Sequence, residues 1–144
     1  MAEVIVTVKL AAPAERVWDF IGGFQSLVEW SGSIKSSVPE QGGRVRRLKT
    51  TDGAVIAERL LNFSEEDRSY TYAIVSGPIP VSNYRSTLRV SGEPGAADCL
   101  VQWSGTFDAV AGAEEAMVGA FQHLYQSAFV DLKRIMGIAG DVIA

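Results

Sequence analysis

The stretch GAEEAMVGAFQHLYQSAFVDLKRIMG, residues 112–137, decides the fold that we predict for this chain. Its apolar residues recur at the three- and four-residue spacing of an amphipathic helix, and about 100° per residue places them on one broad face. About 25 helical residues measure roughly 37 Å, which is long enough to lie across an antiparallel sheet. The residues predicted for the apolar face are Met117, Phe121, Leu124, Ala128, Leu132 and Ile135, flanked by Tyr125, Phe129 and Met136.

Nearly everything before this helix has the pattern of β-strands. Apolar and polar residues alternate over residues 4–10, which is the period of a half-buried strand. Pro13 begins a short helix that ends at Gly22-Gly23, and a second short helical segment covers about residues 25–29. Connections of hairpin length then indicate an antiparallel meander. Its six predicted strands cover about residues 34–38, 44–50, 54–63, 70–75, 83–90 and 100–107.

The order of these elements predicts an α+β protein. We expect a seven-stranded antiparallel sheet, two short helices after the first strand, and one long C-terminal helix that packs on the sheet. At 144 residues the chain has the length of one domain, so residues 1–144 are expected to fold as a unit.

Charge and composition argue against several classes of partner. The net charge is −4, from 13 Lys and Arg against 17 Asp and Glu. Nucleic acid is not an expected partner, because phosphate binding requires a basic face. One basic cluster alternates with apolar residues, which predicts the solvent-facing side of a strand. It consists of Arg44, Arg46, Arg47 and Lys49.

The remaining sequence signals favour a cytoplasmic protein without membrane insertion. The single cysteine, Cys99, excludes an intramolecular disulfide and is typical of a reducing compartment. Residues 1–3 lead directly into a strand pattern rather than a signal peptide, and no apolar run is long enough to span a bilayer. The only histidine, His123, lies on the polar side of the last helix, and no metal-ligand spacing or phosphate-binding glycine pattern occurs. We therefore expect no metal and no cofactor.

Three segments resemble the START-like (SRPBCC) superfamily, which includes polyketide cyclase/dehydrase proteins, the birch-pollen allergen family and, more distantly, plant abscisic acid receptors. The first segment is VIVTVKLAAPAERVWDFIGGFQSLVEW, residues 4–30. The second is AERLLNFSEEDRSYTYAIVSGPIPVSNYRSTLRV, residues 57–90, and the third is the long terminal helix. Together they cover nearly the whole chain in the order and spacing of that superfamily.

This resemblance implies the helix-grip fold, in which a curved sheet grips the long helix and leaves an apolar cavity between them. Such sites are mostly apolar and carry a few convergent polar groups. The fold alone does not assign a function, because it hosts carriers, hormone receptors, cyclases and other lyases. The predicted partner is a small, mostly apolar molecule.

Glu58 is the first candidate for a functional side chain. Strand alternation places it on one face with Ile56 and Leu60, an unusual position for a carboxylate if that face is buried. In the abscisic acid receptors the matching Glu reaches the ligand through water. Burial would raise the pKa of Glu58 and allow it to act as a general acid or base. The alternative is a structural carboxylate that is hydrated or paired with an arginine.

Tyr84 is the second candidate, and with Glu58 it forms our predicted catalytic pair. It shares a strand face with Ser86 and Leu88. Tyr84 and Ser86 match the Tyr and Ser that contact ligand in the receptor branch of the superfamily. A buried tyrosine hydroxyl normally finds a partner, so hydrogen bonding within an ordinary core is the alternative.

Ten further residues are predicted to line the cavity. Gly105, between two aromatic residues on the last strand, is expected to leave room there. For the apolar members, packing in a filled core is the alternative explanation. The predicted ligand-binding residues are Tyr72, Ile74, Ser86, Trp103, Phe107, Phe121, Tyr125, Ala128, Phe129 and Leu132.

The sequence departs from the abscisic acid receptors at the positions that hold the hormone. Ser31 replaces the Lys that pairs with the ligand carboxylate, Trp103 replaces a Glu, and the receptor Asn falls near Phe129. An abscisic acid receptor is therefore not expected. The loop at residues 76–81 contains two prolines, so it is either a lid or, more simply, a stiff turn at the sheet edge.

Three functions remain open from the sequence. The first is a carrier or sensor of an aromatic, lipid-like or polyketide-like molecule. The second is an enzyme, a polyketide cyclase, aromatase or dehydratase that uses Glu58 and Tyr84 for proton transfer. The third is a protein-interaction or stress-response module without a ligand. A cavity of several hundred Å3 on which Glu58 and Tyr84 converge would support the first two, and a filled core would support the third. The oligomeric state is open, a homodimer included.

Overall fold

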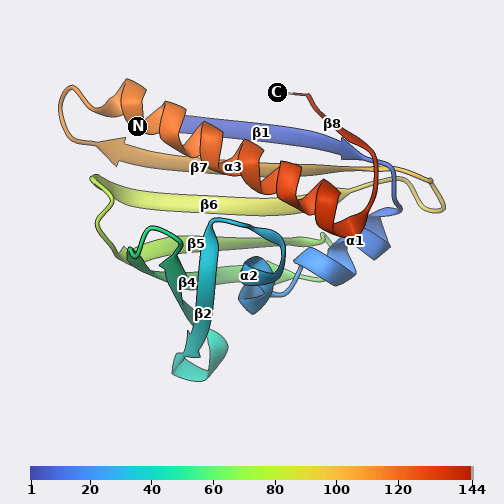
Figure 1. Cartoon of the computed structure of the whole chain (residues 1–144), viewed down its shortest axis with the longest axis horizontal. Coiled ribbons are helices and arrows are strands. Elements are labelled where there is room, and N and C mark those ends of the chain that lie inside the picture. The colour runs from blue at the N-terminus through green and yellow to red at the C-terminus, as the bar shows by residue number, and fades with distance from the viewer. Residues whose placement is uncertain (144) are drawn as a thin grey trace.

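The protein is built around one antiparallel sheet of eight strands, described over residues 1–143 in a computed structural model (Figure 1). The strands lie side by side in the order β2-β3-β4-β5-β6-β7-β1-β8. Their bounds are β1 Ala2–Leu10, β2 Ile34–Glu40, β3 Val45–Thr50, β4 Val55–Ser64, β5 Ser69–Ser76, β6 Val81–Ser91, β7 Cys99–Ala109 and β8 Gly140–Val142. The helices are α1 Ala14–Ile21, α2 Leu27–Trp30 and α3 Glu114–Met136, and the two short 3-10 turns are η1 Phe24–Ser26 and η2 Gln41–Gly43.

Strands β2 to β7 pair with their neighbours in sequence, which is the predicted meander. The first strand, β1, closes the order by pairing with β7 over nine positions, from Ala2 opposite Phe107 to Leu10 opposite Cys99. The α+β class and the helix-grip fold are confirmed. The predicted number of seven strands is wrong, because β8 forms three pairs with β1 after the long helix. Three residues are too few for an alternating pattern to reveal a strand.

The long helix α3 is delimited by its end residues. Glu114 and Glu115 lie in its first turn, where carboxylates interact favourably with the helix dipole. Gly137 follows the last turn with φ 67° and ψ 37°, a left-handed conformation that glycine adopts without a Cβ penalty. The N–H of Ile138 then donates to the carbonyl of Lys133 at 3.1 Å. The chain thus leaves the helix in a tight turn and returns to the edge of β1.

One face of α3 packs on the sheet, crossing in front of β1 and β7 (Figure 1). Met117, Leu124 and Met136 are half-buried at the sides of this face. Ile135 is 42% exposed, so its predicted place on the packed face is wrong. At 100° per residue it lies about 60° from Leu132, at the edge of the stripe. The buried residues of α3 are Phe121, Tyr125, Ala128, Phe129 and Leu132.

The ends of α3 are covered by different parts of the chain. Helix α2 contacts α3, and the N–H of Gly32, just after α2, donates to Asp131 in the C-terminal half of α3 at 2.8 Å. The β5–β6 and β7–α3 connections lie at the other end, where α3 begins (Figure 1). Of the helices within residues 1–143, none is long and apolar enough to cross a membrane.

Candidate functional site

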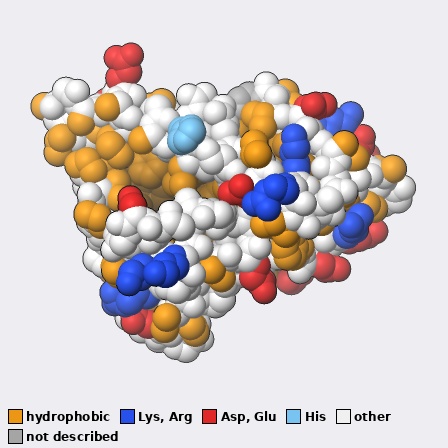
Figure 2. All heavy atoms as spheres, in the orientation of Figure 1, with side chains coloured by type: hydrophobic (Ala, Val, Ile, Leu, Met, Phe, Trp, Pro, Cys, Tyr) orange, Lys and Arg blue, Asp and Glu red, His pale blue; other side chains and the backbone are white. Residues whose placement is uncertain are grey.

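A small cavity lies between the sheet and the first half of α3. Its volume is about 50 Å3. Figure 2 shows hydrophobic side chains gathered around a hollow on the side of the molecule where α3 begins. The walls combine apolar side chains with two serines, two tyrosines and one glutamate. The lining residues are Leu27, Ser31, Ser33, Ile34, Leu48, Glu58, Tyr72, Ile74, Ile79, Tyr84, Trp103, Phe121 and Leu124.

This cavity is smaller than the several hundred Å3 that would support ligand binding. Ligand pockets usually measure about 300–1,000 Å3, whereas one water needs roughly 10–15 Å3. A volume of 50 Å3 therefore holds a few waters and no larger molecule. Glu58 and Tyr84 do converge on it, as expected for a site. A ligand larger than water can enter only if wall side chains move.

The structure separates the twelve predicted site residues into two groups of six. Those that line the cavity are Glu58, Tyr72, Ile74, Tyr84, Trp103 and Phe121. Those that are buried behind the wall, in contact with the core, are Ser86, Phe107, Tyr125, Ala128, Phe129 and Leu132.

Several residues that line the cavity were not predicted from the sequence. Three of them belong to the segment that contains α2 and the start of β2: Leu27, Ser33 and Ile34. The weak sequence pattern of this segment did not indicate that it faces the long helix. Ile79 could have been predicted to line the cavity, because it lies between the two prolines of the loop that the sequence suggested as a lid. Leu124 was predicted on the packed face of the helix but not in the site.

Glu58 forms a buried ion pair with Arg46 from the neighbouring strand. Strand pairing sets Arg46 directly opposite Glu58. Arg46 Nε donates to Glu58 Oε1 at 2.8 Å, and Arg46 Nη2 lies 2.8 Å from the same oxygen. Glu58 is 7% exposed and Arg46 is 0% exposed. The structural alternative considered for Glu58, a carboxylate paired with an arginine, is thus what the structure contains.

The guanidinium of Arg46 is fully enclosed. Its Nη1 donates to the carbonyl of Phe24 at 2.8 Å and to the hydroxyl of Tyr70 at 3.4 Å. The rings of Phe24 and Tyr72 lie 4.2 and 4.7 Å from its Cζ, in cation–π contact. The prediction that the basic cluster faces solvent is therefore wrong for Arg46. Arg46 shares a strand face with Leu48, two residues away, and that spacing was the signal for burial.

Burial and pairing act in opposite directions on this pair. Desolvation raises the pKa of the Glu58 carboxyl, and the positive charge of Arg46 limits that rise. Desolvation lowers the pKa of Arg46, but the Glu58 carboxylate together with Tyr70 and Tyr72 outweighs it, so the net pKa is raised. Arginine stays protonated in any case. The pair brings a carboxylate to the cavity wall with its countercharge on the far side.

A second polar group is a hydrogen-bonded set of side chains on β5, β6, β7 and α3, which we call the hydroxyl network. Ser86 Oγ donates to the carbonyl of Ser104 at 2.7 Å. Trp103 Nε1 donates to Ser86 Oγ at 2.9 Å and to the Tyr72 hydroxyl at 3.2 Å. The hydroxyls of Tyr84 and Tyr125 form a short hydrogen bond, and Tyr125 lies 3.4 Å from Ser86 Oγ. The members are Tyr72, Tyr84, Ser86, Trp103 and Tyr125.

Gly105 makes this network fit. A Cβ at this position would lie 2.5 Å from the Tyr125 hydroxyl and 3.5 Å from the Tyr84 hydroxyl. The room expected at Gly105 therefore exists, but the Tyr125 hydroxyl fills it. Tyr125 is held there by stacking on Trp103, with ring centroids 4.3 Å apart and planes at 15°.

Burial keeps the phenols of the network protonated. Desolvation raises the pKa of Tyr72 and of Tyr84 well above 10. It also raises the pKa of Tyr125, to about 12, although hydrogen bonds from Ser86 and Tyr84 act against the shift. We call these three residues the cavity tyrosines; Tyr72 and Tyr84 line the cavity, and Tyr125 lies behind its wall. Each is a neutral hydrogen-bonding group near pH 7 rather than a source of a phenolate.

The other titratable candidates lie away from the cavity. His123 is exposed and its Nε2 lies 3.4 Å from Ser127 Oγ, as its helical position predicted. Cys99 is buried, and desolvation raises the pKa of its thiol, so it is not activated as a nucleophile. Over residues 1–143, no three His, Cys, Asp or Glu side chains are grouped as a metal site would require.

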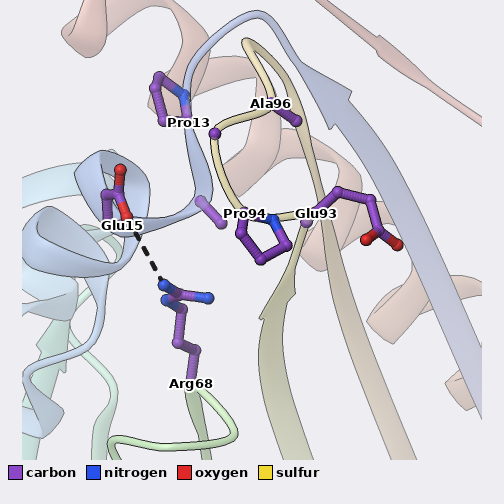
Figure 3. A pocket seen from close by; sticks show the side chains of 9 residues that line it. Pro13, Glu15, Arg68, Glu93, Pro94 and Ala96 are labelled. Carbon is purple, nitrogen blue, oxygen red and sulfur yellow. Dashed lines mark ion pairs between the residues drawn. The ribbon is translucent and has the colours of Figure 1, made fainter.

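A separate pocket of about 140 Å3 lies between the start of α1 and the β6–β7 loop (Figure 3). Arg68 points toward it and lies 3.8 Å from Glu15, which neutralises its charge. It shares no lining residue with the central cavity. Its walls combine prolines, alanines and loop glycines with Glu15, Arg68 and Glu93.

The arrangement as a whole defines a helix-grip protein, in which a long helix and a sheet enclose an aromatic-walled cavity with a few polar groups. The chain belongs to the polyketide cyclase/dehydrase and lipid transport family, whose model matches residues 1–137. The resemblance to the START-like (SRPBCC) superfamily is confirmed. No curated protein matches the sequence.

Solved structures share the fold. The protein XoxI from Bacillus cereus is 40% identical with a TM-score of 0.89, and the match covers 93% of this chain and 94% of that one. The di-domain ARO/CYC protein BexL, from the BE-7585A biosynthetic pathway, is 18% identical with a TM-score of 0.82, over 95% of this chain and 47% of that one. Norcoclaurine synthase from Thalictrum flavum is 15% identical with a TM-score of 0.72, over 94% of each chain. At these lower identities the likeness concerns the fold.

Proposed function

We propose that this protein binds a small, mostly apolar molecule, aromatic, lipid-like or polyketide-like, between the sheet and α3, as a carrier or sensor. The observation that carries this proposal is the convergence of Glu58 and Tyr84 on a cavity otherwise walled by aliphatic and aromatic side chains. Glu58 neutralises the buried Arg46, but apolar residues of similar volume would often fill the same space as stably, so a buried ion pair whose carboxylate reaches an internal surface supports a functional role. The family, which includes lipid transport proteins, supports the same reading.

Binding requires the cavity to open, and its wall is weakest near Ile79. The ladder between β5 and β6 runs from Ser69 opposite Arg89 to Ala73 opposite Arg85, and the chain between them loops out beyond that point. Ile79 lies in this loop and is half-buried against the cavity, as Ile34 and Leu124 are on the other sides of the mouth. Moving Ile79 outward breaks few backbone hydrogen bonds. The loop at residues 76–80 is thus the lid in this proposal.

The test uses the neutral fluorescent probe N-phenyl-1-naphthylamine. Leu124→Trp should fill the mouth of the cavity and weaken probe binding at least tenfold. Val130→Trp is the matched control, because Val130 lies on the same helix, is 53% exposed and does not line the cavity. Probe binding that is equal in both variants and the parent protein would place the probe on the surface and refute the proposal.

An enzyme is the second candidate, favoured by the burial of Glu58. Desolvation raises the pKa of this carboxyl, which suits a general acid or base. Tyr84, whose pKa lies well above 10, suits a hydrogen-bond donor to an oxyanion better than a full proton donor. Cyclisation, aromatisation or dehydration of a polyketide-like molecule needs little more than these groups. Screening such substrates with Glu58→Gln and Tyr84→Phe tests it, and a pH profile unchanged in Glu58→Gln would refute a proton-transfer role for Glu58.

The small volume of the cavity favours the third function, a protein-interaction or stress-response module without a ligand. The probe experiment separates it from the first two. If no apolar probe binds the folded protein at any accessible concentration, the ligand-binding proposal fails and the interaction module becomes the preferred function.

A further inference from the structure

The hydroxyl network has five protons, and its hydrogen-bond contacts do not provide an acceptor for each of them. Ser86 gives its proton to the Ser104 carbonyl, which can only accept. Trp103 Nε1–H can only donate, and it shares its proton between Ser86 Oγ and the Tyr72 hydroxyl. The donor and the acceptor are therefore fixed in the hydrogen bonds that Ser86 and Trp103 form with Ser104, Ser86 and Tyr72. The protons of the three cavity tyrosines remain to be placed.

Two contacts are left for those three protons. They are the Tyr84–Tyr125 hydrogen bond and the 3.4 Å contact from Tyr125 to Ser86. Because the proton of Ser86 is already used, the second contact is a hydrogen bond only when Tyr125 donates in it. Over residues 1–143, the Tyr72 hydroxyl accepts a hydrogen bond from Trp103, and the nearby Ser86 Oγ already accepts from Trp103 and from Tyr125. In this arrangement both lone pairs of Ser86 are occupied, the phenol proton of Tyr72 has no free protein acceptor, and Tyr72 lines the cavity.

Tyr84 can add a second donor by reversal of a single bond. If Tyr84 donates to Tyr125, then Tyr125 donates to Ser86 and Tyr84 offers only lone pairs to the cavity. If Tyr125 donates to Tyr84 instead, its 3.4 Å contact with Ser86 has no proton, and the proton of Tyr84 is free to point into the cavity. Both directions satisfy the short Tyr84–Tyr125 contact. The network can thus present one or two hydroxyl donors to a molecule in the cavity.

The charged side chains near the cavity, Glu58 and Arg46, determine which ligand charge is favoured. Glu58 places a carboxylate on the cavity wall. Arg46 cannot serve an anionic ligand, because its guanidinium is enclosed by Glu58, Phe24 and Tyr72 and does not line the cavity. No other Lys or Arg is among the lining residues described. A ligand carboxylate would meet Glu58 without a countercharge, at a cost in binding free energy.

Resting on the proposed function, we propose that the cavity selects an uncharged aromatic molecule that presents a carbonyl-type oxygen to Tyr72 and Tyr84. Tyr72 donates a hydrogen bond to that oxygen, and Tyr84 can donate a second one when Tyr125 donates to Tyr84. Glu58 accepts a hydrogen bond from a hydroxyl or N–H elsewhere on the ligand and disfavours carboxylates. Tyr72 is then the residue that determines specificity for the oxygen.

Three probes with one ring skeleton test this inference: tetralin, 1-tetralone and tetralin-1-carboxylate. Binding is followed by tryptophan fluorescence, to which Trp103 on the cavity wall contributes together with Trp18 and Trp30. Tyr72→Phe should weaken 1-tetralone about 3- to 10-fold, the value of one net hydrogen bond, and leave tetralin within twofold. Each ligand is compared between proteins, so differences in hydration between the ligands cancel.

Tyr70→Phe is the matched control, because the Tyr70 hydroxyl is buried beside Arg46 and does not line the cavity. It should change neither affinity. The carboxylate should bind at least tenfold more weakly than 1-tetralone, and Glu58→Gln should narrow that gap. If tetralin and 1-tetralone both bind but Tyr72→Phe and Tyr84→Phe leave their ratio unchanged, this inference fails and the proposed function stands. If neither molecule binds the folded protein, both fail.

Discussion

Replacing Gly105 by alanine puts a methyl group where the hydroxyl of Tyr125 lies. The new Cβ would be 2.5 Å from that oxygen and 3.5 Å from the Tyr84 ring and hydroxyl. A glycine in a strand is otherwise unfavourable by roughly 0.5–1 kcal/mol relative to alanine, so an alanine without neighbours would stabilise the protein. The sign of the change therefore depends on whether Tyr125 can move away.

The packing around Tyr125 argues that it cannot move freely. Its ring is stacked on Trp103 and is fully buried. Overpacking of such a site costs about 1–3 kcal/mol, and loss of the Tyr84–Tyr125 hydrogen bond adds about 0.5–1.5 kcal/mol. After the backbone gain is subtracted, we expect Gly105→Ala to lower the free energy of unfolding by about 0.5–4 kcal/mol. Urea denaturation followed by circular dichroism measures it.

Removal of the hydroxyl should relieve the clash. In a Tyr125→Phe background, Gly105→Ala should cost less than about 0.5 kcal/mol, because the atom closest to the new methyl group is gone. Gly119→Ala in α3 is the control, since a Cβ there meets nothing within 4 Å. It should stabilise the protein by up to about 1 kcal/mol. A Gly105→Ala protein as stable as the parent, or one equally destabilised in both backgrounds, would refute the reasoning.

Three further changes follow from the same structure. Arg46→Met should cost about 3–5 kcal/mol of unfolding free energy because it leaves Glu58 buried without a countercharge, whereas Arg46→Met with Glu58→Leu should cost much less; additive losses in urea denaturation would contradict this. The cavity tyrosines, with pKa values raised above the unfolded value near 10, keep protons that the unfolded chain releases. Stability should therefore fall as pH rises from 10 toward 12, by up to about 1.4 kcal/mol per pH unit for each tyrosine, and Tyr125→Phe should reduce the slope; an unchanged slope would argue against it. Gly137→Ala, at φ 67° with open space around the Cβ, should cost about 1 kcal/mol through backbone strain alone, which thermal unfolding would show as a lower Tm.

The candidate site could be predicted from the sequence only in part. Alternation along each strand identified Glu58, Tyr72 and Tyr84 as facing inward, since a strand fixes the side of every second residue. It could not show that Ser86 and Tyr125 lie behind the wall. Depth below a surface depends on how large the neighbours from other elements are, and sequence periodicity gives only direction.

The partner of Glu58 was also beyond the sequence. The charge cluster that contains Arg46 has the composition of a solvated face, and three of its four members are exposed. Arg46 differs from them because pairing of β3 with β4 places it opposite Glu58 under η1 and β5. Arg46 can be buried only because Glu58 lies opposite it on β4, and the sequence alone does not show that pairing.

The sequence by itself determined the class of fold, the meander and the long amphipathic helix, because hydrophobic periodicity and turn residues act over a few neighbouring positions. The tertiary structure alone decided the volume between helix and sheet, which is about 50 Å3. That volume is a small difference between the space that the backbone leaves and the space that the side chains fill. Gly105 shows why no local pattern contains it: the room that this glycine leaves on β7 is filled by a hydroxyl from α3, twenty residues later in the chain.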